Sequence, residues 1–556
     1  MQVLSKTRGT LGHVARSISH PQRQAPVQHR LAFSTSRSMA QKQQPIKHGL
    51  VLGMTSSHKL YGAEAARLSS AQQQQIVSQV QALGSKGDAG SVQLILLNNG
   101  DEQPRHVAVV GLGQDGEISD GMDYTREIVR TAVANGVRQL CSRGPITDVA
   151  VGPMPCQQAS AEGATLALYK FDAFKSKLGS AGENAEKAKV AFTCLEQAQP
   201  ASDSWDAGIV YGEAQNFARD LMNAPANHMT PTIFANRVKD EFATLDNVQV
   251  NVYDQAWAER QRMGGLLAVS KGSEEPLRFV EIIYRGRGGG DVPLAMVGKG
   301  ITFDTGGYNL KPGRHMDLMK GDMGGGATVV AAMRAIARLR LPIDVVATVP
   351  LCENMVSGGA TKVSDVYTSR AGLTVEVMNT DAEGRIVLAD ALHYTIETHQ
   401  PRAIVDVATL TGAMVAALGE LYTGVFTPSP RLWAALAQAS RDTDEPVWRM
   451  PLHDAWDAML KSPVADLSNI GNKAEAGACT AAAFLRQFVG TPRALPGGSV
   501  LRDQNTDEAL PRWAHLDIAG PMEASASSGY HQKGMSGRPT RLLIELARIL
   551  AQAPLP

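Results

Sequence analysis

Two short segments of the chain concentrate charged side chains among glycines. They span residues 297–326 and 379–385, and the charged residues in them that could do chemistry are Lys299, Asp304, Lys311, Asp322, Asp381, Glu383 and Arg385. Lys299 and Asp304 bracket residues 301–303 at the end of a strand that we expect to be buried, where an unpaired charge costs several kcal/mol. Asp381 and Glu383 are two positions apart, so an extended backbone would point both carboxylates to one side. Such carboxylates repel unless one is protonated or a cation lies between them.

Four of these side chains would make an oxygen-rich site of the kind that divalent cations prefer. Two cations about 3.5–4 Å apart, bridged by shared carboxylates, would be the natural occupants of Asp304, Asp322, Asp381 and Glu383. The sequence has no H-E-x-x-H motif, and none of its 13 histidines forms a ligand-like pair near these segments. The residue types alone leave two hypotheses open, hydrolysis assisted by two metal ions and a salt-bridged structural core.

Strand-like and helix-like patterns alternate along the chain around these segments. Runs of branched apolar residues predict strands, and apolar residues three and four apart predict helices. The predicted strands are residues 92–97, 106–110, 248–253, 278–284, 294–297, 345–349 and 403–407, and the predicted helices are residues 123–140, 160–174 and 204–222. The fold class is therefore predicted to be α/β, with a smaller N-terminal α/β domain joined by a helix to a larger α/β catalytic domain. Its central sheet should be mostly parallel, with functional loops at the carboxyl ends of the strands.

A chain of 556 residues is long enough for two domains with separate cores. We expect a transit peptide or disordered basic tail over residues 1–45 and an N-terminal α/β domain over residues 46–203. A connecting helix over residues 204–222 and a catalytic domain over residues 223–556 should follow. Residues 495–512 are rich in Gly, Pro, Asp and Asn, which indicates a surface insertion.

The N-terminal residues differ in composition from the rest. Residues 1–63 contain nine Lys or Arg and no Asp or Glu. An acid-free segment rich in Arg and Ser is typical of a mitochondrial presequence. A basic tail without a targeting role remains an alternative, and translation from Met39 would give a cytoplasmic form.

Bulk composition excludes several other classes of protein. Lys plus Arg and Asp plus Glu both number 54, so no overall basic field would attract nucleic acid or an anionic membrane. Five cysteines are scattered without C-x-x-C spacing, which argues against a disulfide framework and a thiolate zinc site. No apolar run approaches the roughly 20 residues that span a bilayer.

The two charged segments resemble motifs of a known family. Residues 379–385, continuing to Asp390, are similar to the signature of the leucyl aminopeptidase (cytosol aminopeptidase) family, and residues 299–307 match the other metal-binding stretch of that family. Residues 216–231, 476–484 and 513–520 look like further landmarks of the family. The resemblance covers roughly residues 216–520 and is looser in the N-terminal domain.

This resemblance implies a pair of divalent metal ions, Zn²⁺ or Mn²⁺ or both, with Mg²⁺ as an alternative. The tightly bound ion would be held by Lys299, Asp304, Asp322 and Glu383, and the more exchangeable ion by Asp304, Asp381 and Glu383. Lysine can ligate only as a neutral amine, so the metals must displace its proton. Lys311 and Arg385 would be the catalytic pair, with Arg385 binding a bicarbonate ion that moves the proton.

The implied activity is that of a metallo-aminopeptidase acting on peptides with a free N-terminus. The family would line the pocket for the first side chain with Met319, Thr409, Gly412, Ala519 and Met522, whose small or apolar character suits Leu or Met. Each of these residues could equally be plain core. The resemblance also implies a homohexamer. An inactive relative serving as a scaffold is the alternative, and nucleic-acid binding is not favoured by the neutral net charge.

Overall fold

The computed structural model describes residues 47–97, 105–114, 125–176, 190–195, 204–490 and 511–555. These residues belong to one compact unit, Pro45–Pro556. The predicted presequence and nearly all of the predicted insertion at residues 495–512 lie outside the described residues, and only the end of that insertion is seen, as the beginning of a strand. No helix in the described ranges is long and apolar enough to cross a membrane.

The N-terminal sheet has the strand order β3-β4-β1-β5-β6. The bounds of these strands are Val92–Leu97, Arg105–Gly111, His48–Met54, Asp148–Val151 and Ala191–Cys194. The helices beside it are α1 (Ser70–Ala82), α2 (Thr125–Ser142) and α3 (Gln157–Ala167). The predicted strands at residues 92–97 and 106–110 and the predicted helix at residues 123–140 are thus confirmed.

The helix predicted over residues 160–174 is wrong at its C-terminal end, because α3 stops at Ala167. Arg138 Nε donates to the carbonyl oxygen of Ala167 at 2.9 Å. This bond satisfies one of the carbonyls that a helix leaves free at its end. Beyond it the chain departs from the helix, and Phe171 packs against the core of the second domain.

Helix α4 (Trp205–Asn223) follows, and it confirms the helix predicted over residues 204–222 to within one residue. The Ser204 side chain accepts a hydrogen bond from the backbone of Ala207 and so caps the N-terminus. Pro225 lies just beyond the C-terminus and cannot continue a helix. A Cβ atom on Gly208 would lie 2.2 Å from the carbonyl oxygen of Gln158, so only glycine lets α4 pack this closely on α3.

The second sheet has the strand order β16-β15-β18-β14-β9-β11-β8-β7, with β10 paired to β11. The bounds are Val447–Arg449, Thr423–Phe426, Arg512–Asp517, Ala403–Ala408, Leu294–Gly298, Asp344–Asn354, Arg278–Arg285, Val248–Tyr253 and, for β10, Gly300–Asp304. The central pairs β18–β14, β14–β9, β9–β11 and β10–β11 are parallel, whereas β15–β18, β11–β8 and β8–β7 are antiparallel. The predicted α/β class with a mostly parallel central sheet is confirmed.

The five strands predicted in this sheet are all present. Strand β11 is longer than the predicted residues 345–349, because it extends to Asn354 by pairing with β10. The sequence pattern does not indicate β10, which is short and ends in a charged residue.

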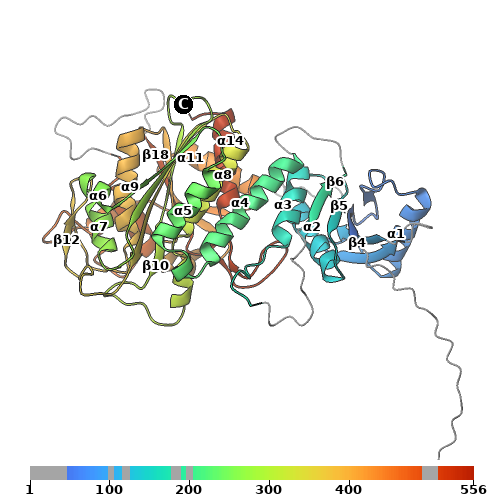
Figure 1. Ribbon diagram of the computed structural model, residues 1–556, viewed down its shortest axis with the longest axis horizontal. Coiled ribbons are helices and arrows are strands. Elements are labelled where there is room, and N and C mark those ends of the chain that lie inside the picture. The colour runs from blue at the N-terminus through green and yellow to red at the C-terminus, as the bar shows by residue number, and fades with distance from the viewer. Residues whose placement is uncertain are drawn as a thin grey trace, which may run out of the picture. The chain divides into compact units, whose positions relative to one another are not determined.

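Helices cover both faces of this sheet (Figure 1). One core joins it to α4, α5 (Pro231–Phe242), α8 (Gly324–Arg338), α11 (Pro430–Thr443) and α14 (Thr540–Gln552). A second core on the other face joins it to α6 (Gln255–Arg260), α7 (Gly264–Ser270), α9 (Gly384–His399) and α13 (Gly477–Arg486). Both faces of the parallel strands are therefore buried, and only their ends can present side chains to a substrate.

Candidate active site

The charged residues singled out in the sequence come together at the carboxyl ends of the central strands. Lys299 directly follows β9 and Asp304 ends β10. Asp322 precedes α8, and Glu383 is the N-cap residue of α9. Ligand sites in open parallel sheets form at this edge, because the loops that follow the strands meet there.

Glycines bring the N-terminus of α8 close to these strand ends. A Cβ atom on Gly298 would lie 2.5 Å from the Cα atom of Gly326, and one on Gly325 would lie 1.9 Å from the carbonyl oxygen of Val407. A Cβ atom at either position would overlap these backbone atoms, so only glycine fits there. The glycine run in the first segment is thus explained by helix-to-strand packing behind the charged residues.

Lys299 lies at the convergence of two carboxylates. Its Nζ atom is 2.8 Å from both Asp322 Oδ2 and Glu383 Oε1, and it donates to the carbonyl oxygen of Thr409 at 3.1 Å. All three charged side chains are almost fully buried. A Cβ atom on Gly384 would lie 2.6 Å from Lys299 Cε, so glycine beside Glu383 leaves room for the lysine.

Lys311 joins the other two carboxylates. Its Nζ atom lies 2.8 Å from Asp304 Oδ2 and 2.5 Å from Asp381 Oδ1. Carboxylate oxygens of Asp304, Asp381 and Glu383 all lie within 4.8 Å of one another. All seven charged residues except Arg385 therefore belong to one linked cluster of two lysines and four carboxylates.

The electrostatics of the cluster show carboxylates crowded in a poorly solvated place. Burial raises the pKa of Asp304 to about 6, and the nearby Glu383 adds to this against the opposing effect of Lys311. Burial also raises the pKa of Asp322 and of Asp381. For Glu383 burial is outweighed by Lys299 and Lys311, so its pKa is lowered. Burial would lower the pKa of Lys299, but Asp322 and Glu383 reverse the shift.

This donor set fits divalent cations. Glu383 Oε2 is buried without a hydrogen-bond partner among the described residues, which is costly unless a ligand satisfies it. Three carboxylates within a few ångströms of one another repel, and a cation between them removes that repulsion. Oxygen donors with one amine match the preferences of Mg²⁺, Mn²⁺ and Zn²⁺.

Neutral residues hold the carboxylates in place; the sequence analysis missed Asn354 and named Thr409 only as a residue of the substrate pocket. Asn354 Nδ2 donates to Asp304 Oδ1 at 2.8 Å, and the backbone amide of Gly306 donates to the same oxygen at 2.9 Å. Thr409 Oγ1 donates to Asp322 Oδ1 at 2.7 Å. The sequence carried no usable signal for Asn354, because the strand is predicted to end at residue 349 and only its observed extension brings Asn354 to the strand end.

Arg385 lies in the first turn of α9, two residues after Glu383. Its Nη1 atom donates to the carbonyl oxygen of Asn469 at 3.1 Å, whereas its buried Nε atom has no hydrogen-bond partner in the described chain. Burial lowers the pKa of Arg385 to about 10, against the effects of Glu383 and Asp517. A buried guanidinium with an unsatisfied donor is suited to hold a small anion.

The five predicted pocket residues come from three segments of the same region. Met319 lies in the short 3₁₀ helix Met316–Gly321, Thr409 and Gly412 follow β14, and Ala519 and Met522 follow β18. Strands β14 and β18 end side by side, with Ala408 opposite Asp517. The Cε atom of Met522 lies 3.0 Å from where a Cβ atom on Gly321 would be. That all five line one pocket for a substrate side chain stays a prediction.

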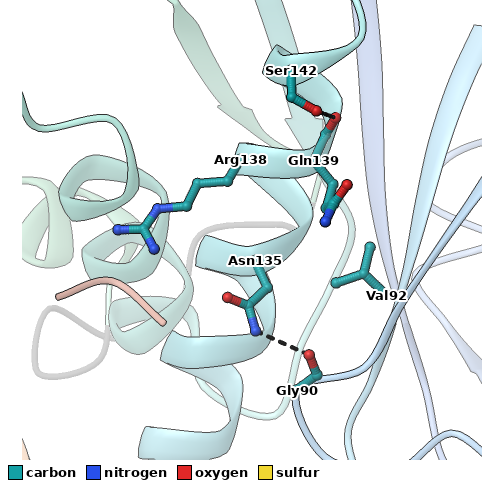
Figure 2. A pocket seen from close by; sticks show the side chains of 6 residues that line it. All are labelled: Gly90, Val92, Asn135, Arg138, Gln139 and Ser142. Atoms are coloured by element: carbon teal, nitrogen blue, oxygen red, sulfur yellow. Dashed lines mark hydrogen bonds between the residues drawn. The ribbon is translucent and has the colours of Figure 1, made fainter. Parts of the chain in front are cut away.

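Two cavities lie away from this cluster. One, of about 490 Å³, is in the N-terminal domain and is lined by Gly90, Val92, Asn135, Arg138, Gln139 and Ser142. Figure 2 shows that Arg138 points away from Gln139 and Val92, so these polar groups do not converge on a ligand. The other, of about 380 Å³, is lined by Phe171, Phe174, His228 and neighbouring residues. Neither holds any residue of the charged cluster.

Known proteins match the chain over most of its length. Residues 216–544 match the catalytic domain of the cytosol aminopeptidase family, and residues 51–178 match its N-terminal domain. The chain is 45% identical over 456 residues to the cytosol aminopeptidase of Xenopus tropicalis, which covers 80% of this chain and 81% of that protein. It is 43% identical over 445 residues to the cytosol aminopeptidase of Homo sapiens, covering 79% and 80%. Among solved structures, the bottromycin maturation enzyme BotP in complex with Mn has a TM-score of 0.75 at 32% identity, covering 91% of this chain and 99% of that chain.

Proposed function

Because the chain belongs to the cytosol aminopeptidase family and is a metal-dependent aminopeptidase, we propose that its charged cluster is the active site. There it removes N-terminal residues, preferably Leu and other apolar residues, from peptides. One observation carries the assignment. Asp304, Asp381 and Glu383 converge within 4.8 Å beside two lysines at the carboxyl edge of the sheet.

We propose that this cluster holds two divalent cations. Lys299, Asp304, Asp322 and Glu383 would hold one, and Asp304, Asp381 and Glu383 the other. Zn²⁺ and Mn²⁺ are the proposed occupants, with Mg²⁺ as a third option, and a solved relative is described in complex with Mn. When bound, such cations lower the pKa of a water molecule and polarise a peptide carbonyl.

The residues around the cluster complete the proposed mechanism. The pKa of Lys311 is raised, because Asp304 and Glu383 outweigh the effect of burial, so the side chain is cationic at neutral pH. The Lys311 side chain is part exposed, with Nζ beside Asp304, and it can stabilise negative charge that develops on the substrate carbonyl oxygen. Arg385 would hold a bicarbonate ion through its unsatisfied donor, and this ion would accept the proton from the attacking water molecule.

The remaining features of the proposal concern substrate, assembly and location. Met319, Thr409, Gly412, Ala519 and Met522 would form the pocket for the first side chain. The chain would assemble as a homohexamer, which light scattering of the purified protein would test. The acid-free N-terminal residues support a mitochondrial form, and a start at Met39 would give the cytoplasmic form that the names of the relatives suggest.

The experiment that tests the site assignment is the substitution Glu383→Ala. Glu383 contacts Lys299 and lies beside Asp304 and Asp381, so its loss should abolish release of leucine from leucine amide and lower the bound metal. In the wild type, a chelator should remove activity, and Zn²⁺ or Mn²⁺ should restore it.

Glu545→Ala is the matched control. Glu545 is equally buried but lies in α14, where it pairs with Tyr211 and Arg548. This variant should keep the activity and metal content per folded molecule. Full activity of Glu383→Ala would reject the assignment.

A further inference from the structure

Asn469 is a fully buried polar residue beside the active site, on a segment far from it in sequence. It directly follows β17 (Leu467–Ser468), which pairs in parallel with β13 (Thr374–Glu376). Its backbone amide continues that pairing by donating to the carbonyl oxygen of Glu376 at 3.0 Å. The side chain therefore lies against the residues that come after β13.

The side-chain amide of Asn469 is used entirely on the backbone of those residues. Its Oδ1 atom accepts from the backbone amides of Met378 at 2.8 Å and Asn379 at 3.2 Å. Its Nδ2 atom donates to the carbonyl oxygens of Asn379 at 2.6 Å and Ala382 at 3.4 Å. An amide has two donors and an acceptor with two lone pairs, so all four positions are taken by one loop.

This loop carries the carboxylates of the proposed metal site. Residues 377–383 connect β13 to α9 and belong to no helix or strand themselves. On its other side the loop is tied through Thr380, whose amide donates to Asn309 Oδ1 at 2.8 Å and whose Oγ1 donates to the carbonyl oxygen of Gly306 at 2.6 Å. Asn469 is thus the tether on one side, and the loop that bears Lys311 is the tether on the other.

Asn469 also contacts Arg385 directly. The carbonyl oxygen of Asn469 accepts from Arg385 Nη1 at 3.1 Å. One residue therefore fixes the backbone around Asp381 through its side chain and the guanidinium of Arg385 through its main chain. The relative position of these two groups depends on where Asn469 lies.

We propose that Asn469 is a positioning residue that sets the loop bearing Asp381 and Glu383 in register with Arg385. This inference rests on the proposed function of the cluster. Groups that orient metal ligands from behind commonly contribute about 10–100-fold to metal affinity or activity. An aspartate at this position would keep the acceptor oxygen but place negative charge against the carbonyl oxygens of Asn379 and Ala382, so an amide is required.

The test compares Asn469→Ala and Asn469→Asp with Asp466→Ala. Asp466 Oδ2 accepts from the backbone amide of Thr374 at 2.8 Å and from its hydroxyl at 2.7 Å. Asp466→Ala therefore loosens the same strand pair at its opposite end without touching the loop. For each protein, Mn²⁺ affinity is measured on the metal-stripped form by electron paramagnetic resonance, along with kcat and KM for leucine amide and the Tm.

Of the two proposed Mn²⁺ ions, both Asn469 variants should bind the more weakly held one about 10–100-fold less tightly than the wild type. Their kcat should fall in similar proportion. Asp466→Ala should lower Tm while its Mn²⁺ affinity and kcat match the wild type. If Asn469→Ala does not fold, the isosteric Asn469→Asp carries the comparison. Wild-type Mn²⁺ affinity and kcat in the folded Asn469 variants would overturn the inference, as would equal losses in Asp466→Ala. A wild-type protein that bound no Mn²⁺ would instead contradict the proposed function on which the inference rests.

Discussion

Lys299 and Lys311 each pair with two carboxylates, yet they are placed for different tasks. Lys299 is almost fully buried between Asp322 and Glu383. It can contribute a lone pair only as a neutral amine, so cations that bind there must displace its proton. Lys311 has a side chain that is 21% exposed, and it can meet a substrate as a cation. The same residue type thus serves as a proposed ligand in one place and as a source of positive charge in the other.

Substitution of Arg385 tests its proposed role in catalysis. Arg385→Lys keeps a positive charge but loses the planar fork and the Nη1 bond to Asn469. We expect kcat for leucine amide to fall about 100-fold, as when one oriented donor is removed from a site of developing charge. Steady-state kinetics with and without added bicarbonate check this. Unchanged kcat in the variant would show that Arg385 takes no part in the proton transfer.

The charged residues of the site are predictable from sequence, whereas its neutral supports are not. Unpaired charges beside apolar strand residues are costly, so the sequence alone marks Lys299 and Asp304 as residues that need partners, and the two-residue spacing of Asp381 and Glu383 marks a pair of carboxylates that would repel. Asn354 and Asn469 act on groups from distant segments. Amides of this kind occur throughout a sequence, and nothing in their spacing marks them.

At the scale of elements, the site depends on parallel strands that end together. The β14–β9 pair places Val407 opposite Gly298, and the β14–β18 pair places Ala408 opposite Asp517. Lys299, Thr409 and the residues after β18 therefore emerge side by side. Asp517 stabilises this edge by accepting from the backbone amide of Leu410 at 3.2 Å and the hydroxyl of Thr411 at 2.6 Å.

Glu281 on β8 gives a prediction for the junction between the sheet and α9. It is buried and accepts hydrogen bonds from Asn251 and Tyr253 on β7 and from Tyr394 on α9, with His399 at 2.8 Å. Burial raises the pKa of Glu281, but these bonds, led by that with His399, outweigh it and lower the pKa from 4.5 to about 2. A lowered pKa stabilises the folded state at pH values above the ordinary pKa of the carboxyl group. This contribution to stability is lost as pH falls from about 4.5 toward about 2.

Glu281→Gln should therefore lower the free energy of unfolding at neutral pH by on the order of 3 kcal/mol, and the loss should shrink below about pH 4. Denaturant unfolding at a series of pH values measures both proteins. Stability curves that run parallel from neutral to acid pH would contradict this role for Glu281.

Helices and strands are predicted correctly where the local sequence pattern agrees with the contacts made in the folded structure. The apolar strands at residues 248–253 and 403–407 are found at those positions. Strand β11 is predicted too short and β10 is missed, because their shared pairing is made by the fold rather than by local pattern. Helix α3 also ends earlier than predicted because of a tertiary contact, in which Arg138 from α2 donates a hydrogen bond to the carbonyl oxygen of Ala167 at the end of the helix.

At the scale of the whole molecule, buried charges join the N-terminal domain to the catalytic domain. Arg541 on α14 donates to Glu162 on α3 at 2.9 Å and to Gln215 on α4 at 2.8 Å. Arg130 on α2 also donates to Glu162, at 2.7 Å. Glu162 and Arg541 are 379 residues apart in sequence, so no local pattern could have paired them. The domain limits predicted from sequence stay a prediction, while the two-domain architecture is shown.

We propose that Lys299 and the four carboxylates hold a pair of divalent cations in the folded molecule. Anomalous diffraction from a crystal of the full chain grown with Mn²⁺ tests this most directly. We predict two strong peaks per chain, one within bonding distance of Lys299 Nζ and Asp322, the other of Asp381, with Asp304 and Glu383 contacting both. A map without a peak in this cluster, or with Lys299 still paired to Asp322 and Glu383 while Mn²⁺ is bound elsewhere, would contradict the account.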